Sequence, residues 1–243
     1  MKIYAKTDIG MQRKMNQDAY CISDENEEYV LCVLADGMGG YTGGEIASNL
    51  AAMSVDKYIK ENFIKGKDYT KEELQELVKK AIEYANFTVY EKSKREEELE
   101  QMGTTLEICL IYNNRAFIGH IGDSRIYRIR QDIMRKITVD HSYVQKLVKE
   151  GKITKEEAEN HPKKNMLMKA LGCELEIEPD VTVKGFQEGD IILICSDGLT
   201  NMVQEQEIYN IIKNDFENAT ENLIKKANQN GGNDNITIIL IKN

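Results

Sequence analysis

The chain has 243 residues, 41% of them hydrophobic, which suffices for the core of one large domain or two small ones. Its formal net charge of −9 argues against a protein that tracks nucleic-acid phosphates, because such proteins need a basic surface. Residues 1–8 lack the apolar segment of a signal peptide, and no apolar run approaches the roughly 18 residues of a membrane-spanning helix. We expect neither a nucleic-acid partner nor a membrane anchor.

The five cysteines form no CxxC pair, and Cys32, Cys109 and Cys195 lie within apolar runs. A buried, reduced thiol behaves as a small hydrophobic group. An odd number of cysteines outside a disulfide framework indicates a reducing compartment. We therefore expect the protein to be cytoplasmic.

Residues 2–8 and 19–35 predict strands around a polar turn from Ser23 to Glu28. The second of these segments ends in a short apolar run, residues 30–35, which is typical of a buried strand.

Two amphipathic helices are predicted next. Residues 43–64 place apolar side chains three and four positions apart, the spacing of one helix face. Residues 70–98 repeat the pattern, and Thr70 followed by Glu73 predicts a capping box at the start of this second helix.

From residue 103 the apolar period changes to two, which favours strands. Asn113 and Asn114 supply a tight turn between two of them, and Gly122-Asp123 supplies the next turn. The alternation continues to residue 137. This pattern predicts an antiparallel meander.

Residues 141–170 are charged and predict helices without a strand. The remaining elements are strands and helices in alternation: strands at 181–186 and 191–195, helices at 204–213 and 217–229, and a last strand at 235–241. Because no linker or repeat divides the chain, we predict one α+β domain over residues 1–243.

Four aspartates lie where an apolar strand meets a glycine- or asparagine-rich turn: Asp36, Asp123, Asp197 and Asp234. Aspartate and glycine often mark strand ends, but a carboxylate beside a buried strand is costly unless something neutralises it. Clustered carboxylates without histidine favour Mg²⁺ or Mn²⁺ rather than zinc. Gly37 has no side chain to keep a ligand away, so its carbonyl can join such a site.

Short motifs follow one another along nearly the whole chain: Thr7-Asp8-Ile9-Gly10, Arg13-Lys14-Met15-Asn16-Gln17-Asp18, Asp36-Gly37-Met38-Gly39-Gly40, Met102-Gly103-Thr104-Thr105, Gly122-Asp123-Ser124-Arg125-Ile126-Tyr127, Asp140-His141-Ser142, Ser196-Asp197-Gly198-Leu199 and Asp234-Asn235-Ile236-Thr237. In this order they resemble bacterial members of the PPM class of metal-dependent protein serine/threonine phosphatases, also called type 2C. Each motif alone is weak, and the ordered set is specific.

The resemblance implies two antiparallel sheets packed as a sandwich and flanked by helices on both sides, an αββα arrangement. It also implies a helical flap insert at about residues 141–170. This insert is either a mobile lid that selects substrates or a solvated pair of helices.

The resemblance further implies a site for two divalent ions, Mn²⁺ or Mg²⁺. Asp36 would bridge both ions, with Asp18 and the Gly37 carbonyl at one of them. Asp197 and Asp234 would hold the other.

Two more residues match the family's motifs. Asp123, with Asp197, would hold a weaker third ion. Arg13 would bind the phosphate, which suits a guanidinium fork.

By resemblance, a water bridging the two ions attacks phosphorus in line, without a phosphoenzyme. The implied substrates are phosphoserine and phosphothreonine in proteins, and the enzyme would be a monomer that opposes a bacterial serine/threonine kinase.

The chain departs from the family pattern at Tyr41, where many bacterial relatives have a histidine that can protonate the leaving group. We expect His120 to be a core residue of a strand, His141 to orient backbone near the flap, and His161 to reach the site only by loop motion. The proton donor is therefore left open between Tyr41 and a metal-bound water.

Two other interpretations remain. A non-catalytic binding module on the same fold should have lost ligands, whereas all five aspartates are present. A phosphatase acting on small molecules, or one that regulates sporulation or stress, would prefer small phosphate esters to a phosphothreonine peptide.

Overall fold

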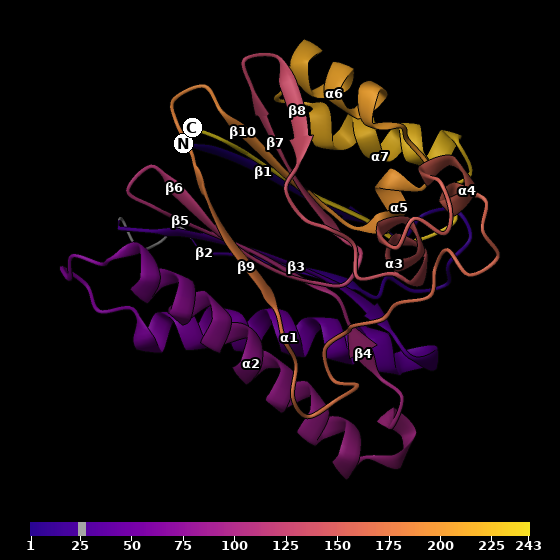
Figure 1. Ribbon diagram of the computed structural model, residues 1–243, viewed down its shortest axis with the longest axis horizontal. Coiled ribbons are helices and arrows are strands. Elements are labelled where there is room, and N and C mark those ends of the chain that lie inside the picture. The colour runs from indigo at the N-terminus through magenta and orange to yellow at the C-terminus, as the bar shows by residue number, and fades with distance from the viewer. Residues whose placement is uncertain (24–27) are drawn as a thin grey trace.

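The computed structural model describes residues 1–23 and 28–243, with only the backbone for residues 40–42. The predicted polar turn from Ser23 to Glu28 lies mostly outside the described residues. The described elements form two antiparallel sheets packed face to face, with helices on both outer faces (Figure 1). The predicted αββα sandwich is confirmed.

The first sheet has the strand order β1, β11, β10, β7, β8. Its strands are β1 (Lys2–Asp8), β7 (Arg125–Arg130), β8 (Ile133–Lys136), β10 (Ile191–Cys195) and β11 (Ile236–Lys242). Helices α6 (Glu205–Asn214) and α7 (Ala219–Gln229) cover its outer face (Figure 1).

The second sheet has the order β2, β3, β5, β6, β9, with the short β4 paired to the end of β3. Its strands are β2 (Asp18–Ser23), β3 (Val30–Met38), β4 (Gly103–Thr104), β5 (Leu106–Tyr112), β6 (Arg115–Ile121) and β9 (Asp180–Gly185). Helices α1 (Gly40–Asn62) and α2 (Lys71–Arg95) cover its outer face, and a 3₁₀ turn, Glu97–Leu99, follows α2. The capping box of Thr70 and Glu73 is present as predicted.

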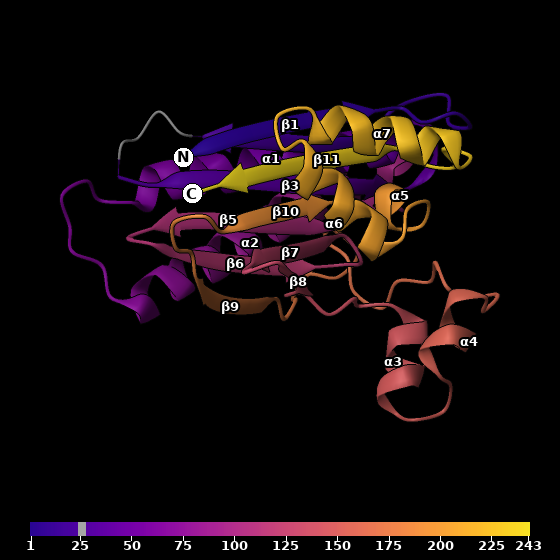
Figure 2. The same ribbon diagram turned by 90° about the horizontal axis from the view of Figure 1, so that it is seen from above.

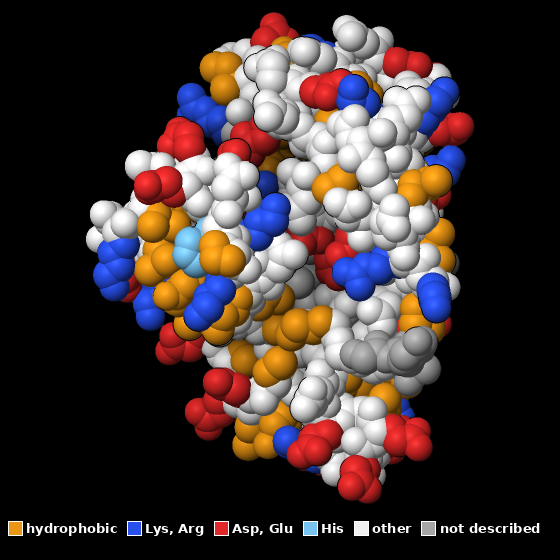
Figure 3. Space-filling model, turned by 90° about the vertical axis from the view of Figure 1, so that its right-hand side faces the viewer, with side chains coloured by type: hydrophobic (Ala, Val, Ile, Leu, Met, Phe, Trp, Pro, Cys, Tyr) orange, Lys and Arg blue, Asp and Glu red, His pale blue; other side chains and the backbone are white. Residues whose placement is uncertain are grey.

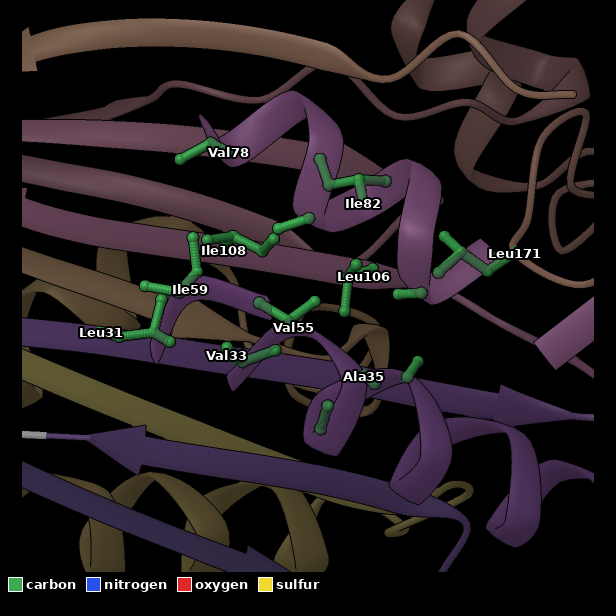
Figure 4. Packing of buried hydrophobic residues seen from close by; sticks show 14 of the residues in the cluster. Leu31, Val33, Ala35, Val55, Ile59, Val78, Ile82, Leu106, Ile108 and Leu171 are labelled. Atoms are coloured by element: carbon green, nitrogen blue, oxygen red, sulfur yellow. The ribbon is translucent and has the colours of Figure 1, made fainter. Parts of the chain in front are cut away.

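The alternation along β3 shows how the core is divided. Leu31, Val33 and Ala35 pack against α1, where Figure 4 shows them beside Val55 and Ile59. Cys32 and Leu34, on the other face of the strand, pack in the layer between the two sheets. A third apolar layer lies under α6 and α7. Each buried aliphatic side chain contributes about 1.5–3 kcal/mol relative to an exposed one.

The predicted meander over residues 103–137 is wrong. β5 and β6 do pair around Asn113 and Asn114, whose φ angles are 46° and 57°. After β6, however, the chain crosses at Gly122–Ser124 to the other sheet, where β7 pairs with β10 and β8. The inner faces of both sheets bury apolar residues in one shared layer, so the alternating pattern predicts the strands but not the sheet to which each belongs.

The segment between β8 and β9 projects from one end of the sandwich (Figure 2). The predicted helices are shorter here than expected: α3 (Tyr143–Lys149) and α4 (Lys155–Glu159), whose residues are all at least partly exposed. Turns and extended chain make up the remainder, and Ser142 pairs with Leu167 in an isolated bridge. Within the described ranges, no helix has the length and apolar character needed to cross a membrane.

Candidate active site

A cleft of about 690 Å³ opens at the end of the sandwich from which α3 and α4 project. Figure 3 looks onto this end and shows acidic side chains in a hollow, next to basic ones. The cleft is lined by Asp36, Asp123, Asp197, Asp234, Gly37 and Arg13, and by Asn165 and Leu167 from the projecting segment.

Strand pairing brings these aspartates together. Asp18, the first residue of β2, stands directly opposite Asp36 on β3. Asp197 begins the short helix α5 (Asp197–Thr200) just after β10, and Asp234 lies just before β11, the partner of β10. The cluster therefore forms at the end of the sandwich, where strands of both sheets end. Sequence patterns also missed α5.

A glycine makes the approach of Asp197 to Asp234 possible. A Cβ at Gly198 would lie only 1.9 Å from the Asn235 carbonyl oxygen. A residue with a side chain would push α5 away from the start of β11 and separate the two aspartates.

Two threonines hold the backbone of Asp36. The Thr105 hydroxyl accepts a bond from the Asp36 amide (3.0 Å), and the Thr104 hydroxyl donates to the Asp36 carbonyl (2.9 Å). The Thr105 hydroxyl also lies 3.0 Å from that of Ser124, the residue after Asp123. These contacts link the two strand ends that carry Asp36 and Asp123.

Asp18 is buried and only half satisfied. Its Oδ2 accepts bonds from the hydroxyls of Ser196 (2.9 Å) and Thr237 (2.6 Å). Its Oδ1 is buried and has no hydrogen-bond partner among the described residues. A buried oxygen of this kind is costly unless a proton or a cation satisfies it.

Burial and mutual repulsion raise the pKa of Asp18, Asp36 and Asp123. Burial, followed by repulsion from Asp18, Asp197, Asp123 and Asp234, holds the pKa of Asp36 well above the usual aspartate range. Burial, partly offset by the two hydroxyl bonds, raises the pKa of Asp18 to about 7. Burial and then Asp197 raise the pKa of Asp123 to about 7. The cluster holds more negative charge than its surroundings compensate.

The donor set fits a hard divalent cation. Every candidate ligand is a carboxylate or carbonyl oxygen, and a Cβ at Gly37 would lie 2.0 Å from the Gly44 carbonyl oxygen, so only glycine fits there. Within the described residues, however, no three His, Cys, Asp or Glu side chains already converge as they would around an ion. Asp18 Oδ1 has no partner to give up, whereas Asp234 Oδ2 faces Arg13, so an ion at Asp234 would compete with the arginine.

Arg13 reaches the cluster from the loop between β1 and β2. Its Nη2 donates to Asp234 Oδ2 at 2.7 Å, and its side chain is 51% exposed. Asn235 holds this loop: its side chain donates to the carbonyls of Ile9 and Met15 and accepts from the Gln17 amide. Sequence reasoning gave Asn235 no role, although an asparagine directly between a candidate ligand and an apolar strand was a usable signal.

The three histidines are placed close to expectation. His120 is buried in β6 with both ring nitrogens bonded, as predicted for a core residue. His141 lies at the base of the projecting segment and bonds to the backbone of Gly122, and His161 accepts a bond from the Lys163 amide. The side chain of Tyr41, a candidate proton donor, lies outside the described part of the chain.

Comparison with known proteins agrees with this arrangement. Residues 11–240 match the family model for protein phosphatase 2C. The chain is 38% identical over 239 residues to the serine/threonine phosphatase stp of Listeria innocua, covering 98% of this chain and 94% of that one.

Two solved structures are similar over nearly their full lengths. The serine/threonine phosphatase of S. agalactiae has a TM-score of 0.90 and 35% identity, covering 99% of this chain and 98% of that one. The catalytic domain of the phosphatase PstP, in complex with two manganese ions, has a TM-score of 0.85 and 34% identity, covering 98% and 96%.

A two-sheet sandwich with an acidic cleft at one end, together with these matches, defines a metal-dependent phosphoric ester hydrolase. The chain belongs to the protein phosphatase 2C family, and it is a protein serine/threonine phosphatase.

Proposed function

We propose that the cleft binds two divalent cations, Mn²⁺ or Mg²⁺, through Asp18, Asp36, the Gly37 carbonyl, Asp197 and Asp234. The observation that carries this proposal is the buried Asp18 oxygen without a partner, next to carboxylates whose pKa values are raised by burial and by one another. Repulsion of this kind is relieved most directly by cations.

When bound, such ions would screen the phosphate charge and lower the pKa of a water nucleophile. Asp36 takes the central position, because its carboxylate is repelled by all four other aspartates. Asp123 is repelled most strongly by Asp197 among its neighbours, which supports a weaker third position shared by these two residues.

Arg13 binds the phosphate of the substrate. Its guanidinium is half exposed at the cleft and contacts only the edge of the cluster, at Asp234. A planar guanidinium can pair with two phosphate oxygens at once, so transfer from Asp234 to the substrate would keep it fully bonded. The group that protonates the leaving alkoxide is Tyr41 or a water.

Residues 1–243 act as one phosphatase domain with a flap at about residues 141–170. Asn165 and Leu167 of this segment line the cleft, which supports a role for the flap in selecting substrates. The enzyme opposes a serine/threonine kinase as a monomer in the cytoplasm. Cys21, Cys109, Cys173 and Cys195 are free thiols, as suits a reducing compartment.

The proposal is tested by hydrolysis of a phosphothreonine peptide and of a small phosphate ester, each with excess EDTA, Mn²⁺ or Mg²⁺. We expect no turnover in EDTA, turnover with Mn²⁺ at least equal to that with Mg²⁺, and preference for the peptide. Full activity in EDTA would contradict the metal site. Preference for the small ester would contradict the protein substrate without affecting the metal site.

A further inference from the structure

A second group of buried titratable side chains lies beneath the flap, outside the aspartate cluster. Glu107 on β5 and His120 on β6 stand directly opposite each other, and both are almost completely buried. The His141 ring stacks on the His120 ring, with centroids 4.5 Å apart and planes at 26°.

Both ring nitrogens of His120 face acceptors. Nδ1 lies 2.6 Å from Glu107 Oε1, and Nε2 lies 2.9 Å from the Val139 carbonyl oxygen. Either the imidazole is doubly protonated, or a protonated Glu107 donates to it, so neither nitrogen can exchange a proton with a substrate. The pair instead anchors Val139, which lies just before the flap.

His141 is joined to Gly122 by two bonds in opposite directions. The His141 amide donates to the Gly122 carbonyl (2.7 Å), and the Gly122 amide donates to His141 Nδ1 (3.1 Å). Gly122 directly precedes Asp123, so these bonds fix the backbone that presents the Asp123 side chain.

The same residue holds the returning end of the flap. The His141 carbonyl accepts a bond from the Met168 amide at 2.7 Å, and the next residue, Ser142, pairs with Leu167. Both ends of the flap therefore meet at His141, and Leu167 itself lines the cleft.

We propose that His141 is a positioning residue that couples the flap to the Asp123 loop, through the hydrogen bond that its Nδ1 accepts from the Gly122 amide. A nitrogen that accepts this bond carries no proton, so the proton of the neutral ring lies on Nε2, 3.4 Å from Asp180 Oδ2. Burial and the neighbouring His120 lower the pKa of His141 to about 4, which is consistent with a neutral ring.

Two substitutions of His141 separate this role from a general packing role. In His141→Asn the amide oxygen can take the place of Nδ1 and accept from Gly122, whereas in His141→Gln the longer side chain places its polar atoms near the position of Nε2 and loses that bond. His141→Ala removes both side-chain contacts, the one with the Gly122 amide and the one with Asp180. Each variant is measured by hydrogen–deuterium exchange without metal, and by kcat and KM on a phosphothreonine peptide with Mn²⁺.

We expect His141→Gln and His141→Ala to exchange about tenfold faster than wild type over residues 120–124 and 139–143, because a buried hydrogen bond is lost. Their kcat should fall about tenfold, the usual scale for residues that support a metal ligand. His141→Asn should remain within about threefold of wild type in both measurements, as expected for a retained acceptor.

Equal behaviour of the Asn and Gln variants in exchange, or unchanged exchange over both segments, would overturn the proposal, and this comparison holds even if His141→Ala fails to fold. The expected fall in kcat rests on the proposed role of Asp123 as a metal ligand. If exchange follows the expected order and kcat does not change, the coupling stands and the role of Asp123 is wrong.

Discussion

The five aspartates at the cleft and Asp140 at the base of the flap are all buried or partly buried, yet the charges around them are arranged in opposite ways. In the cleft, burial and neighbouring aspartates raise the pKa of Asp18, Asp36, Asp123 and Asp197. At the flap base, Asp140 accepts bonds from Arg125 Nη2 (2.7 Å), Arg125 Nε (3.1 Å) and Lys136 Nζ (3.0 Å).

The pKa values of two aspartates, one in each region, show this difference. Burial alone would raise the pKa of Asp140, but Arg125 and Lys136 outweigh it and lower that pKa. Burial also acts on Asp36, where neighbouring carboxylates add to it. Cations of the chain itself therefore compensate Asp140, whereas the carboxylates of the cleft lack such compensation, as expected of the cation site proposed above.

The largest effect should follow from breaking the cleft at its centre. Asp36→Asn should lower turnover of a phosphothreonine peptide with Mn²⁺ by at least about a thousandfold, because it removes a preorganised charge at the reacting centre. The matched control is Asp132→Asn, which changes an aspartate that is 75% exposed and does not line the cleft. Turnover within tenfold of wild type in Asp36→Asn would contradict the central position of Asp36.

Breaking the ion pairs around Asp140 should lower the stability of the fold rather than turnover. Arg125→Met leaves Asp140 buried with less compensation, so the free energy of unfolding in EDTA should fall by about 3 kcal/mol. For a chain of this size the melting temperature should drop by roughly 10 °C. The double variant Arg125→Met/Asp140→Asn should lose less than the single one. A single variant as stable as wild type would show that the flap base is not held by this pair.

The contribution of the Glu107–His120 pair to stability should depend on pH. Burial raises the pKa of Glu107 to about 7. Burial would lower the pKa of His120, but the Glu107 carboxylate, helped by Asp140, outweighs it and raises that pKa to about 9. Both values exceed those of the unfolded chain, about 4.3 and 6.5. The folded state therefore binds more protons, and the pair's contribution to the free energy of unfolding should decline as pH rises from about 4.5 to 9.

With three histidines in the chain, NMR titration can resolve His120 directly. We expect its ring to titrate near 9 in the wild type. In Glu107→Gln, burial is no longer opposed by the carboxylate, so the ring should titrate below the ordinary histidine value of about 6.5. A wild-type His120 that already titrates below that value would mean that the pair is not an ion pair.

The smallest effect should come from the exposed edge of the cleft. Arg13→Ala should raise KM for the phosphopeptide by about tenfold and should not weaken binding of Mn²⁺ measured by calorimetry, because the arginine binds phosphate rather than metal. Lys14→Ala, at a neighbouring basic residue that lines the same cleft, is the control for charge alone. Loss of metal binding in Arg13→Ala would show that our assignment of its role is wrong.

Local patterns predicted the elements well, because each depends on residues close in sequence. The period of two along β5 and β6, the asparagine turn between them and the capping box at Thr70 all needed no tertiary information. Assigning β7 to its sheet did need tertiary information, since its apolar face fits either sheet. The crossing at Gly122–Ser124 is decided by long-range pairing.

The residues of the cleft also differ in whether a local sequence pattern could predict them. Asp36, Asp123, Asp197 and Asp234 stood out because each follows or precedes an apolar strand beside a turn. Asp18 begins a strand and was found only through the family motifs. Its hydroxyl partners Ser196 and Thr237 lie about 180 and 220 residues away along the chain, so no local pattern could have revealed them.

The most direct test of the account is a thermal melt of wild type and Asp36→Asn, each with EDTA and with millimolar Mn²⁺. Binding to the folded state alone adds about 2.7 kcal/mol at a hundred times Kd, so Mn²⁺ should raise the wild-type melting temperature by roughly 5–10 °C. In EDTA, Asp36→Asn should melt no lower than wild type, since one repelling charge is gone, and Mn²⁺ should raise its melting temperature by less. A wild-type melting temperature indifferent to Mn²⁺ would contradict the claim that these aspartates form one cation site.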